Sequence, residues 1–267
     1  MRIEPGTRAI VTGASRGIGR AVALALAARG ARLGVLARGK EGLAELIERL
    51  PASPAGKHLA LAADIGRRRE VEKAIERFAK RAGPPELLVA NAGIAHYAPF
   101  ADQDLEDAEL MVRVNVLGTI YTVRAALGEM LARGRGHVVV VSSAAGLRAF
   151  PWAAVYGGTK AFDRGFAEAL RHELSGTGIG LTTVFPGQIE TELHAHERER
   201  MPDWSDEEGR ADPGPLAGAI VRAVEADRRH VFAPANVRLL GLNGIAPRLT
   251  DRLLAAVMGP TAAPRRD

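Results

Sequence analysis

The chain contains no cysteine, which excludes disulfide bonds, thiolate nucleophiles and metal sites built on cysteine. This absence fits a reducing compartment, so we expect the protein in the cytoplasm. Aromatic residues make up only 4% of the 267 residues and do not interleave with basic ones, so no nucleic-acid partner is expected. The seven histidines lack the spacing of a metal site, and no metal is expected either.

Long apolar runs and long runs of one charge are also missing. No uninterrupted apolar stretch approaches the roughly 18 residues that a membrane-spanning helix needs. The first seven residues show no charged-then-apolar targeting pattern. The formal charge of +5 comes from basic residues mixed with acidic ones, which does not predict a polyanionic partner.

Short apolar segments alternate with longer helical patterns along most of the chain. This order is typical of βαβ units, which form a parallel sheet with helices on both faces. The expected strands span residues 8–12, 32–37, 58–62, 87–90, 137–141, 180–185 and 230–232. The expected helices span residues 17–29, 42–50, 69–81, 105–133, 152–175 and 215–226. Seven strands predict a doubly wound, Rossmann-type α/β fold.

The chain shows no internal repeat and no linker of biased composition. We therefore expect one dinucleotide-binding and catalytic domain over residues 1–235, since 47% hydrophobic residues can bury a large core. A helical extension of the same domain is expected over 236–259, and a disordered tail over 260–267. The charged stretch 192–213 is expected to be a mobile loop.

A glycine-rich turn follows the first expected strand and opens the first expected helix. Small residues let the backbone approach a pyrophosphate, and the helix N-terminus offers unpaired N–H groups and partial positive charge. The alternative is a tight turn without a ligand, which the accompanying motifs disfavour. The residues of this predicted cofactor site are Gly13, Ser15, Arg16, Gly17, Ile18 and Gly19.

The end of the second expected strand carries Arg38, where sites that favour NAD usually carry a carboxylate. A guanidinium pairs with a 2′-phosphate through two parallel hydrogen bonds, and Arg16 can reach the same group. These arginines predict NADP(H) in preference to NAD(H). The alternative is that both are solvated surface side chains.

Tyr156 and Lys160 are four residues apart on an expected helix, so their side chains share one face. A free phenol titrates near pKa ~10, and a neighbouring cation favours its charged form. Tyr156 is therefore expected to exchange a proton with an alcohol or carbonyl oxygen near neutral pH. Ser143, thirteen residues upstream, is expected to hydrogen-bond that oxygen.

With Asp64, the Asn91-Ala92-Gly93 turn, Asn115 and the Pro186-Gly187 pair, these motifs resemble the short-chain dehydrogenase/reductase family over residues 5–233. The resemblance implies a catalytic set of Asn115, Ser143, Tyr156 and Lys160, and its spacing selects Ser143 over Ser142. It also implies that Asn115 holds a water through its backbone at a helix irregularity, which links Lys160 to solvent.

The resemblance implies further cofactor contacts, with Asp64 at the adenine and Lys160 at the ribose. Ala90 departs from the family pattern, since many members carry a second asparagine there, and this weakens the expected hydrogen bonding beside the adenosine. The cofactor-binding residues implied beyond the glycine turn and Arg38 are Asp64, Ile65, Asn91, Ala92, Gly93, Tyr156, Lys160, Pro186, Gly187, Ile189 and Thr191.

We therefore expect an NADP(H)-dependent oxidoreductase that interconverts a carbonyl and a secondary alcohol by hydride transfer. The expected substrate contacts are Ser143, Tyr156, His96, Phe150 and Gln188. Their mostly apolar and aromatic surroundings predict a lipid-like, steroid-like or aromatic substrate. Two alternatives stay open, a 3-oxoacyl-type reductase and a non-catalytic NADP(H)-binding sensor or scaffold.

The resemblance also implies a homo-oligomer, a dimer or a tetramer, paired through the helices at 105–133 and 152–175. The segment 236–258 places leucines among arginines in an amphipathic pattern. Such a segment can contact a membrane surface, cover an apolar pocket or pack on a partner subunit. Packing against its own domain is the favoured alternative.

Overall fold

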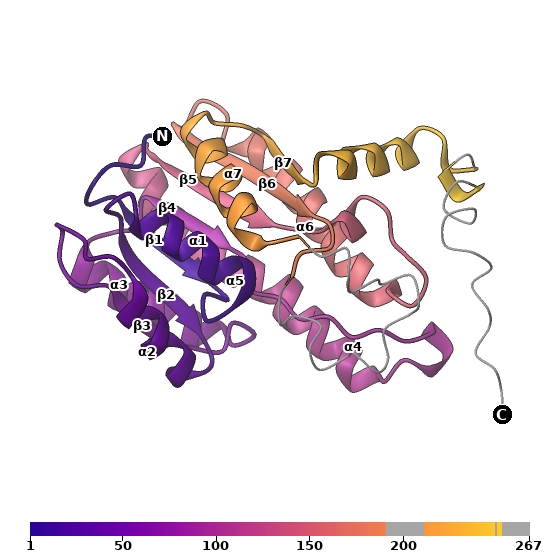
Figure 1. Ribbon diagram of the computed structural model, residues 1–267, viewed down its shortest axis with the longest axis horizontal. Coiled ribbons are helices and arrows are strands. Elements are labelled where there is room, and N and C mark those ends of the chain that lie inside the picture. Colours follow the sequence, from indigo (N-terminus) through magenta and orange to yellow (C-terminus); the bar gives the residue numbers. More distant parts are fainter. Residues whose placement is uncertain (191–210, 249, 253–267) are drawn as a thin grey trace.

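The computed structural model describes residues 1–190, 211–248 and 250–252 of the chain. Its strands are β1 Arg8–Thr12, β2 Arg32–Ala37, β3 Leu59–Ala62, β4 Leu87–Ala90, β5 Gly136–Val141, β6 Ile179–Pro186 and β7 His230–Ala233. They form one parallel sheet in the order β3-β2-β1-β4-β5-β6-β7 (Figure 1). The predicted seven-stranded Rossmann-type sheet is thereby confirmed.

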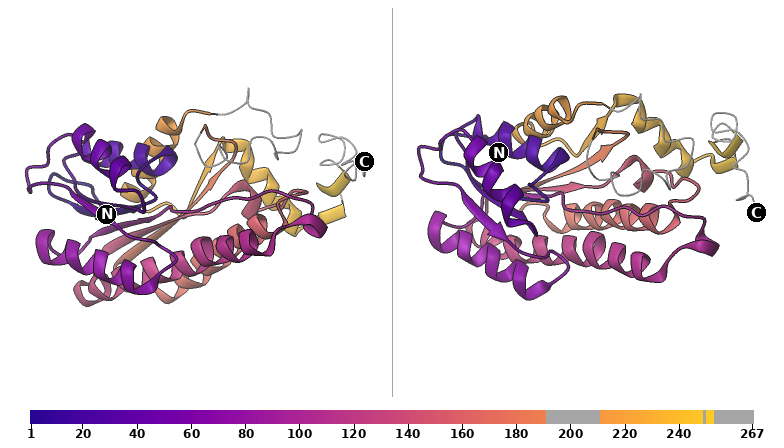
Figure 2. Two further views of the ribbon diagram at one scale, coloured as in Figure 1. Left: turned by 90° about the horizontal axis from the view of Figure 1, so that it is seen from below. Right: turned by 60° about the horizontal axis from the view of Figure 1, so that its bottom comes forward.

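Helices cover both faces of the sheet. They are α1 Gly17–Ala27, α2 Lys40–Arg49, α3 Arg68–Ala82, α4 Leu105–Met111, α5 Gly118–Arg133, α6 Ala154–Glu173 and α7 Pro213–Glu225. One layer contains α1, α2 and α7, and the other contains α3, α5 and α6 (Figure 2). The described residues also form three 3-10 segments, η1 Phe100–Asp102, η3 Ala144–Gly146 and η6 Ala235–Gly244, and one π-helical turn, η2 Val112–Leu117.

Strand β5 shows why the sheet forms at these residues. Its sequence GHVVVV is buried along its whole length, as expected for a parallel strand covered on both faces. Val138 and Val140 pack against the layer of α3, α5 and α6, whereas Val139 and Val141 pack against the layer of α1, α2 and α7. Burying each such side chain contributes about 1.5–3 kcal/mol, so these valines hold both layers to the sheet.

The order of the strands creates a crevice at the carboxyl edge of the sheet. The chain proceeds outward from β1 to β3 and then crosses back to place β4 on the other side of β1. The chain therefore leaves β1 and β4 toward opposite faces of the sheet, and ligands of doubly wound folds bind at such a point. The glycine turn after β1 and the Asn91 turn after β4 meet there.

The predicted helix over 105–133 differs from a regular α-helix. It begins after Asp104, whose side chain accepts a hydrogen bond from the backbone N–H of Glu106 (2.8 Å), and it is interrupted by the π-helical turn η2. Leu105–Arg133 is long and apolar enough to cross a membrane by length and composition. It packs against α3 and α6, however, so it is a core helix of this layer.

The segment after β7 is helical, first as η6 and then over residues 247–248 and 250–252 (yellow in Figure 1). Val237 is buried with Ala144 and Phe185, so the first turn packs on its own domain. Leu242 and Ile245 are 50% and 83% exposed, and the later part projects from the body of the domain. The expected tail over 260–267, and most of the expected loop over 192–213, lie outside the described residues.

Candidate active site

A cavity of about 780 Å³ opens along the carboxyl edge of the sheet. Its volume lies within the roughly 300–1,000 Å³ typical of cofactor and small-molecule sites. The predicted site residues that line it are Gly13, Ser15, Arg16, Gly17, Ile18, Arg38, Asp64, Ile65, Asn91, Ala92, Gly93, Ser143, Phe150, Tyr156, Lys160, Pro186, Gly187, Gln188 and Ile189. Three predicted residues, Gly19, His96 and Asn115, lie outside this lining, and Thr191 lies outside the described residues.

The glycine turn closes one end of the cavity. Gly13 and Gly17 have φ values of +64° and +51°, in the left-handed region that glycine adopts without strain. A Cβ at Gly19 would lie 2.2 Å from the carbonyl oxygen of Gly13, so α1 can pack this close only with glycine there. No described side chain caps the start of α1. Its first N–H groups are therefore available to an anion, and this end of the cavity fits a dinucleotide phosphate.

Thr12 and Asn91 join the two loops that border the crevice. The Thr12 hydroxyl donates to the carbonyl of Val89 (3.3 Å) and accepts from the backbone N–H groups of Asn91 (3.0 Å) and Ala92 (3.1 Å). The Asn91 amide in turn donates to the carbonyl of Thr12 (2.9 Å). These bonds fix the floor of the cavity before any ligand arrives.

The end of the cavity at the glycine turn carries charge. Arg16 and Arg38 are exposed at its rim, and β2 ends in Ala37, so no carboxylate stands at the end of that strand. Asp64 accepts a hydrogen bond from the backbone N–H of Gly66 (2.9 Å), which holds its carboxylate at the turn after β3. Two exposed guanidinium groups beside a glycine turn, neither in an ion pair with another described residue, fit an anionic ligand.

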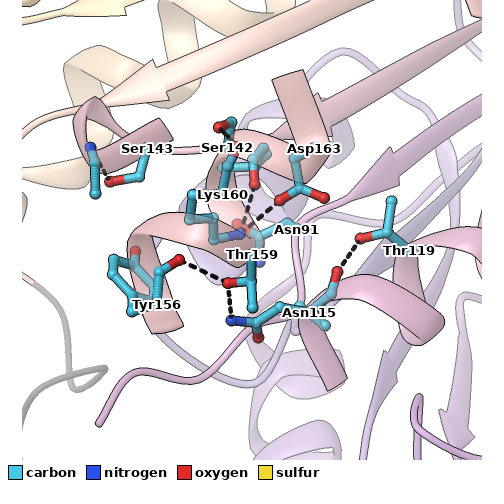
Figure 3. Close-up of polar contacts among 12 residues, drawn as sticks. Asn91, Asn115, Thr119, Ser142, Ser143, Tyr156, Thr159, Lys160 and Asp163 are labelled. Atoms are coloured by element: carbon cyan, nitrogen blue, oxygen red, sulfur yellow. Dashed lines mark hydrogen bonds and ion pairs between the residues drawn. The ribbon is translucent and has the colours of Figure 1, made fainter. Parts of the chain in front are cut away.

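Three predicted catalytic side chains meet near the middle of the cavity (Figure 3). Ser143 follows β5, and its Oγ accepts from the N–H of Ala145 (3.1 Å), which leaves its O–H to donate to a ligand. Tyr156 is 7% exposed, and its ring packs edge-to-face on Tyr97 with centroids 5.9 Å apart. Lys160 lies one turn further along α6, between Tyr156 and Asp163.

Lys160 is held from two sides. Its Nζ donates to the carbonyl oxygen of Val141 (3.0 Å) and to Oδ2 of Asp163 (2.9 Å). Burial acts to lower the pKa of Lys160, but the charges of Asp163 and Tyr156 outweigh burial, and the net direction is upward. Lys160 is therefore a buried ammonium at the edge of the cavity.

Ser142 has a different task from its neighbour Ser143. Its hydroxyl donates to the carbonyl oxygen of Lys160 (2.7 Å), which ties the end of β5 to α6. Gly146 packs against the same place, since a Cβ there would lie 2.5 Å from both the Lys160 carbonyl oxygen and Ser142 Oγ. The Ser142 proton is thus used inside the protein, whereas that of Ser143 is not.

Asn115 lies behind the cavity in η2, so the helix irregularity implied at this position is present. Its side-chain amide donates to the carbonyl of Ile94 (2.9 Å) and to the Thr159 hydroxyl (3.0 Å), and it accepts from the N–H of Ile94 (2.9 Å). Its own carbonyl accepts from the Thr119 hydroxyl (2.8 Å). Asn115 thus fastens the loop after β4 to η2 and α6.

His96 was expected to contact the substrate, but it does not line the cavity. Its Nδ1 lies 3.4 Å from Oδ2 of Asp107 on α4, and this pair draws the ring toward that helix. Sequence reasoning missed Asp163, although a carboxylate three residues after Lys160, on the face of the helix that carries Tyr156 and Lys160, was a signal. Val237 and Leu240 line the cavity from η6, which agrees with the alternative that the segment 236–258 covers an apolar pocket.

Comparison with known proteins gives a family and relatives. The family model described as short chain dehydrogenase matches residues 7–202. Glycine betaine reductase ATRR of Emericella nidulans is 37% identical over 223 residues, covering 82% of this chain but only 18% of that protein. The 3-oxoacyl-[acyl-carrier-protein] reductase of Bos taurus is 37% identical over 183 residues, covering 68% of this chain and 76% of that protein.

Solved structures share the fold. An alcohol dehydrogenase from the archaeon Thermococcus sibiricus, complexed with 5-hydroxy-NADP, matches 85% of this chain and 95% of its own with a TM-score of 0.75 and 25% identity. A short chain dehydrogenase/reductase from Burkholderia phymatum in complex with NAD matches 94% of this chain and 97% of its own, with a TM-score of 0.83 and 24% identity.

Proposed function

Because the chain belongs to the short-chain dehydrogenase/reductase family and is an NAD(P)-dependent oxidoreductase, we propose that it interconverts carbonyl compounds and secondary alcohols with NADP(H) as its favoured cofactor. The observation that carries this proposal is the meeting of Ser143, Tyr156 and Lys160 in one cavity with the glycine turn. A proton donor, a second hydroxyl donor and a buried cation can act there on one oxygen atom.

Each of these side chains has a separate task in the proposed reaction. The nicotinamide, when bound, supplies or accepts the hydride. Tyr156 donates the proton to the carbonyl oxygen, and the Ser143 hydroxyl hydrogen-bonds the same atom as negative charge develops on it. The Lys160 ammonium stabilises the phenolate left behind, and it would hold the ribose of a bound cofactor. Asn115 supports this set through Thr159 and the loop after β4, and its role in a proton relay stays a prediction.

The preference for NADP(H) rests on the two arginines at the rim. Arg16 and Arg38 flank the end of the cavity where β2 lacks a carboxylate, and paired guanidinium groups suit a 2′-phosphate. The two solved neighbours carry an NADP derivative and NAD, so their likeness alone does not decide between the cofactors.

Steady-state kinetics with both cofactors test this preference. We expect a higher kcat/KM with NADPH than with NADH, and Arg38→Asp is expected to reduce the ratio by at least about tenfold, as for loss of a charged hydrogen bond. Arg77→Asp, an exposed arginine on α3 outside the cavity lining, is the matched control and should leave the ratio unchanged. A wild-type preference for NADH would contradict the proposal.

The substrate is proposed to be an apolar or aromatic ketone or its alcohol. Tyr97, Phe150, Val237 and Leu240 line the cavity, and together they give it an apolar wall. A 3-oxoacyl thioester is the second candidate, because the bovine relative carries that name. Arg148, a candidate for docking an acyl carrier, is engaged by Asp251 and by Asn243 (2.9 Å), which favours the first candidate.

A screen of NADPH oxidation decides among these candidates. Aromatic and steroid-like ketones are expected to be reduced faster than 3-oxoacyl thioesters, because a buried apolar wall rewards apolar contact. The reverse order would favour the acyl substrate. Absence of turnover with every compound would favour a sensor or scaffold and contradict the proposed reaction.

The proposed assembly is a dimer or tetramer through α4, α5 and α6. Leu105, Val112 and Leu117 are 71%, 43% and 36% exposed along the helix formed by α4, η2 and α5, where a partner subunit would bury them. Light scattering at micromolar concentration measures the mass, and a monomer of 28.3 kDa would contradict this part of the proposal.

A further inference from the structure

Helix α6 presents three ionisable groups on one face. Tyr156, Lys160 and Asp163 follow each other at spacings of four and three residues, so their side chains stack along the side of the helix that faces the sheet. Tyr156 and Lys160 line the cavity, whereas Asp163 does not. Asp163 therefore contacts the cavity only through Lys160.

The Lys160–Asp163 pair is an ion pair inside the protein. The Nζ···Oδ2 distance is 2.9 Å, and the two side chains are 6% and 1% exposed. Oδ1 of Asp163 is also buried without a hydrogen bond to the described residues, since the nearby Thr119 hydroxyl gives its proton to the Asn115 carbonyl. An apolar side chain would fill this place at lower cost, so packing alone does not account for a carboxylate here.

We propose that Asp163 is a positioning residue that keeps Lys160 charged and fixed beside Tyr156, and so sets the upper pH limit of carbonyl reduction. This inference rests on the proposed role of Tyr156 as the proton donor. Asp163 does not touch the reacting atoms, and it acts entirely through Lys160.

The surroundings of the pair support this assignment. The charged or titratable groups that act on Lys160 are Asp163 and Tyr156, and the other group bound to its Nζ is the neutral carbonyl of Val141. From η2 and α5, the groups that face the pair are the uncharged Asn115 and Thr119. Burial raises the pKa of Asp163, although the charge of Lys160 opposes this shift. The charges of Asp163 and Tyr156 raise the pKa of Lys160 despite its burial.

Removal of the Asp163 charge has one expected direction. If Lys160 then releases its proton more readily, the ammonium beside Tyr156 is lost at lower pH. If Lys160 instead stays charged, its uncompensated charge holds the Tyr156 proton less firmly in place for transfer to the carbonyl oxygen. Carbonyl reduction requires both protons, so the alkaline limb of its pH profile moves to lower pH in either case.

The first experiment is the pH profile of kcat/KM for carbonyl reduction. Asp163→Asn is expected to move the alkaline limb down by about 1–3 pH units, the range for removal of one close opposite charge. Asp163→Glu keeps a carboxylate and should move it less. The control Thr122→Val is an isosteric change at a buried position on α5 and should not move it. A limb that stays in place, or moves up, in Asp163→Asn would overturn the inference.

The second experiment needs no activity. Urea unfolding is measured for the parent, Asp163→Asn, Lys160→Met and the double variant, which removes both charges. The double variant is expected to unfold at a higher urea concentration than Asp163→Asn, because it leaves no unpaired buried charge. Additive losses of stability would overturn the inference. Where Asp163→Asn does not fold alone, a double variant that also fails to fold would overturn it. If the parent reduces no carbonyl compound, the proposed reaction fails, and this cycle still decides whether Asp163 keeps Lys160 charged.

Discussion

A buried basic side chain lies at each end of β5, but only one of the two stays charged. At the carboxyl end, the carbonyl of Val141 accepts a hydrogen bond from Lys160, which has Asp163 at 2.9 Å. At the amino end, His137 is fully buried, and its nearest carboxylate, that of Asp227, is 69% exposed and 3.8 Å away. Burial lowers the pKa of His137 to about 4.

The hydrogen bonds of His137 identify its neutral form. The Thr182 hydroxyl donates its one proton to the carbonyl of Arg228 (2.6 Å), so Nε2 of His137 must donate to the Thr182 oxygen (2.9 Å). Nδ1 then carries no proton and makes no hydrogen bond to the described residues. His137 is a neutral ring that holds β5 to β6.

The difference between the two ends shows what a buried charge requires. A buried base stays protonated where an equally buried acid lies within hydrogen-bonding distance, and it loses its proton where the acid is solvated and more distant. In this protein, the charged arrangement lies beside the cavity at the carboxyl edge of the sheet, and the neutral one lies at the amino edge. We therefore expect the first to affect reaction rate and the second to affect only stability.

The largest expected effect comes from the cavity end. Tyr156→Phe removes the proposed proton donor and is expected to lower turnover by at least ~10²-fold, while the unfolding midpoint changes little. His137→Gln, the control at the other end of β5, should keep parental turnover. Rates are measured with the best carbonyl substrate at saturating NADPH. Parental turnover in Tyr156→Phe would show that Tyr156 is not the proton donor and that the arrangement beside the cavity does not determine the reaction rate.

A smaller effect, on stability, is expected from His137. Its folded-state pKa of about 4 lies below the ordinary 6.5, so between these values the unfolded chain binds the proton more tightly. The free energy of unfolding should therefore fall by about 3 kcal/mol from this group as pH decreases from about 6.5 to 4. Urea titrations of the parent and His137→Gln at pH 7.5, 5.5 and 4.5 measure it. An equal pH dependence in both proteins would show that His137 titrates normally.

The smallest effect is expected at Asp227. Because its carboxylate is mostly solvated, Asp227→Asn should change the free energy of unfolding by less than about 0.5 kcal/mol. Asparagine also tolerates the left-handed backbone of this position, where φ is +48°. The same substitution at Asp163 should cost several times more. Equal losses at the two sites, measured by urea unfolding, would mean that burial of the acid does not matter.

Local patterns made much of the molecule predictable from the sequence. The seven strands were predicted to within about one residue at each end, because short apolar segments between helical patterns can only be buried strands in such a fold. Tyr156 and Lys160 share a face because both lie on one helix, so their meeting follows from spacing alone. Arg38 reaches the rim because it directly follows β2, and Arg16 because it lies in the turn between β1 and α1.

Other features depend on distances between elements that spacing does not determine. The apolar pattern over 105–133 predicts one continuous helix and does not reveal the π-helical turn around Asn115, which only the family resemblance implied. His96 is turned aside by Asp107, a partner on another element. Asp163 lies within the predicted helix, but only its burial beside Lys160 distinguishes it from a solvated acid.

The contact of Gly146 with α6 has a consequence for redesign of the enzyme. Since the backbone at Gly146 rests directly on the carbonyl of Lys160, residues 142–146 cannot change shape without displacing the helix that carries Tyr156. Loop grafts intended to alter substrate choice should therefore leave these residues in place and begin at Leu147, where the side chain is half-buried. A transplanted loop that also replaces residues 142–146 would displace Tyr156 and lower the reaction rate in addition to changing the substrate specificity.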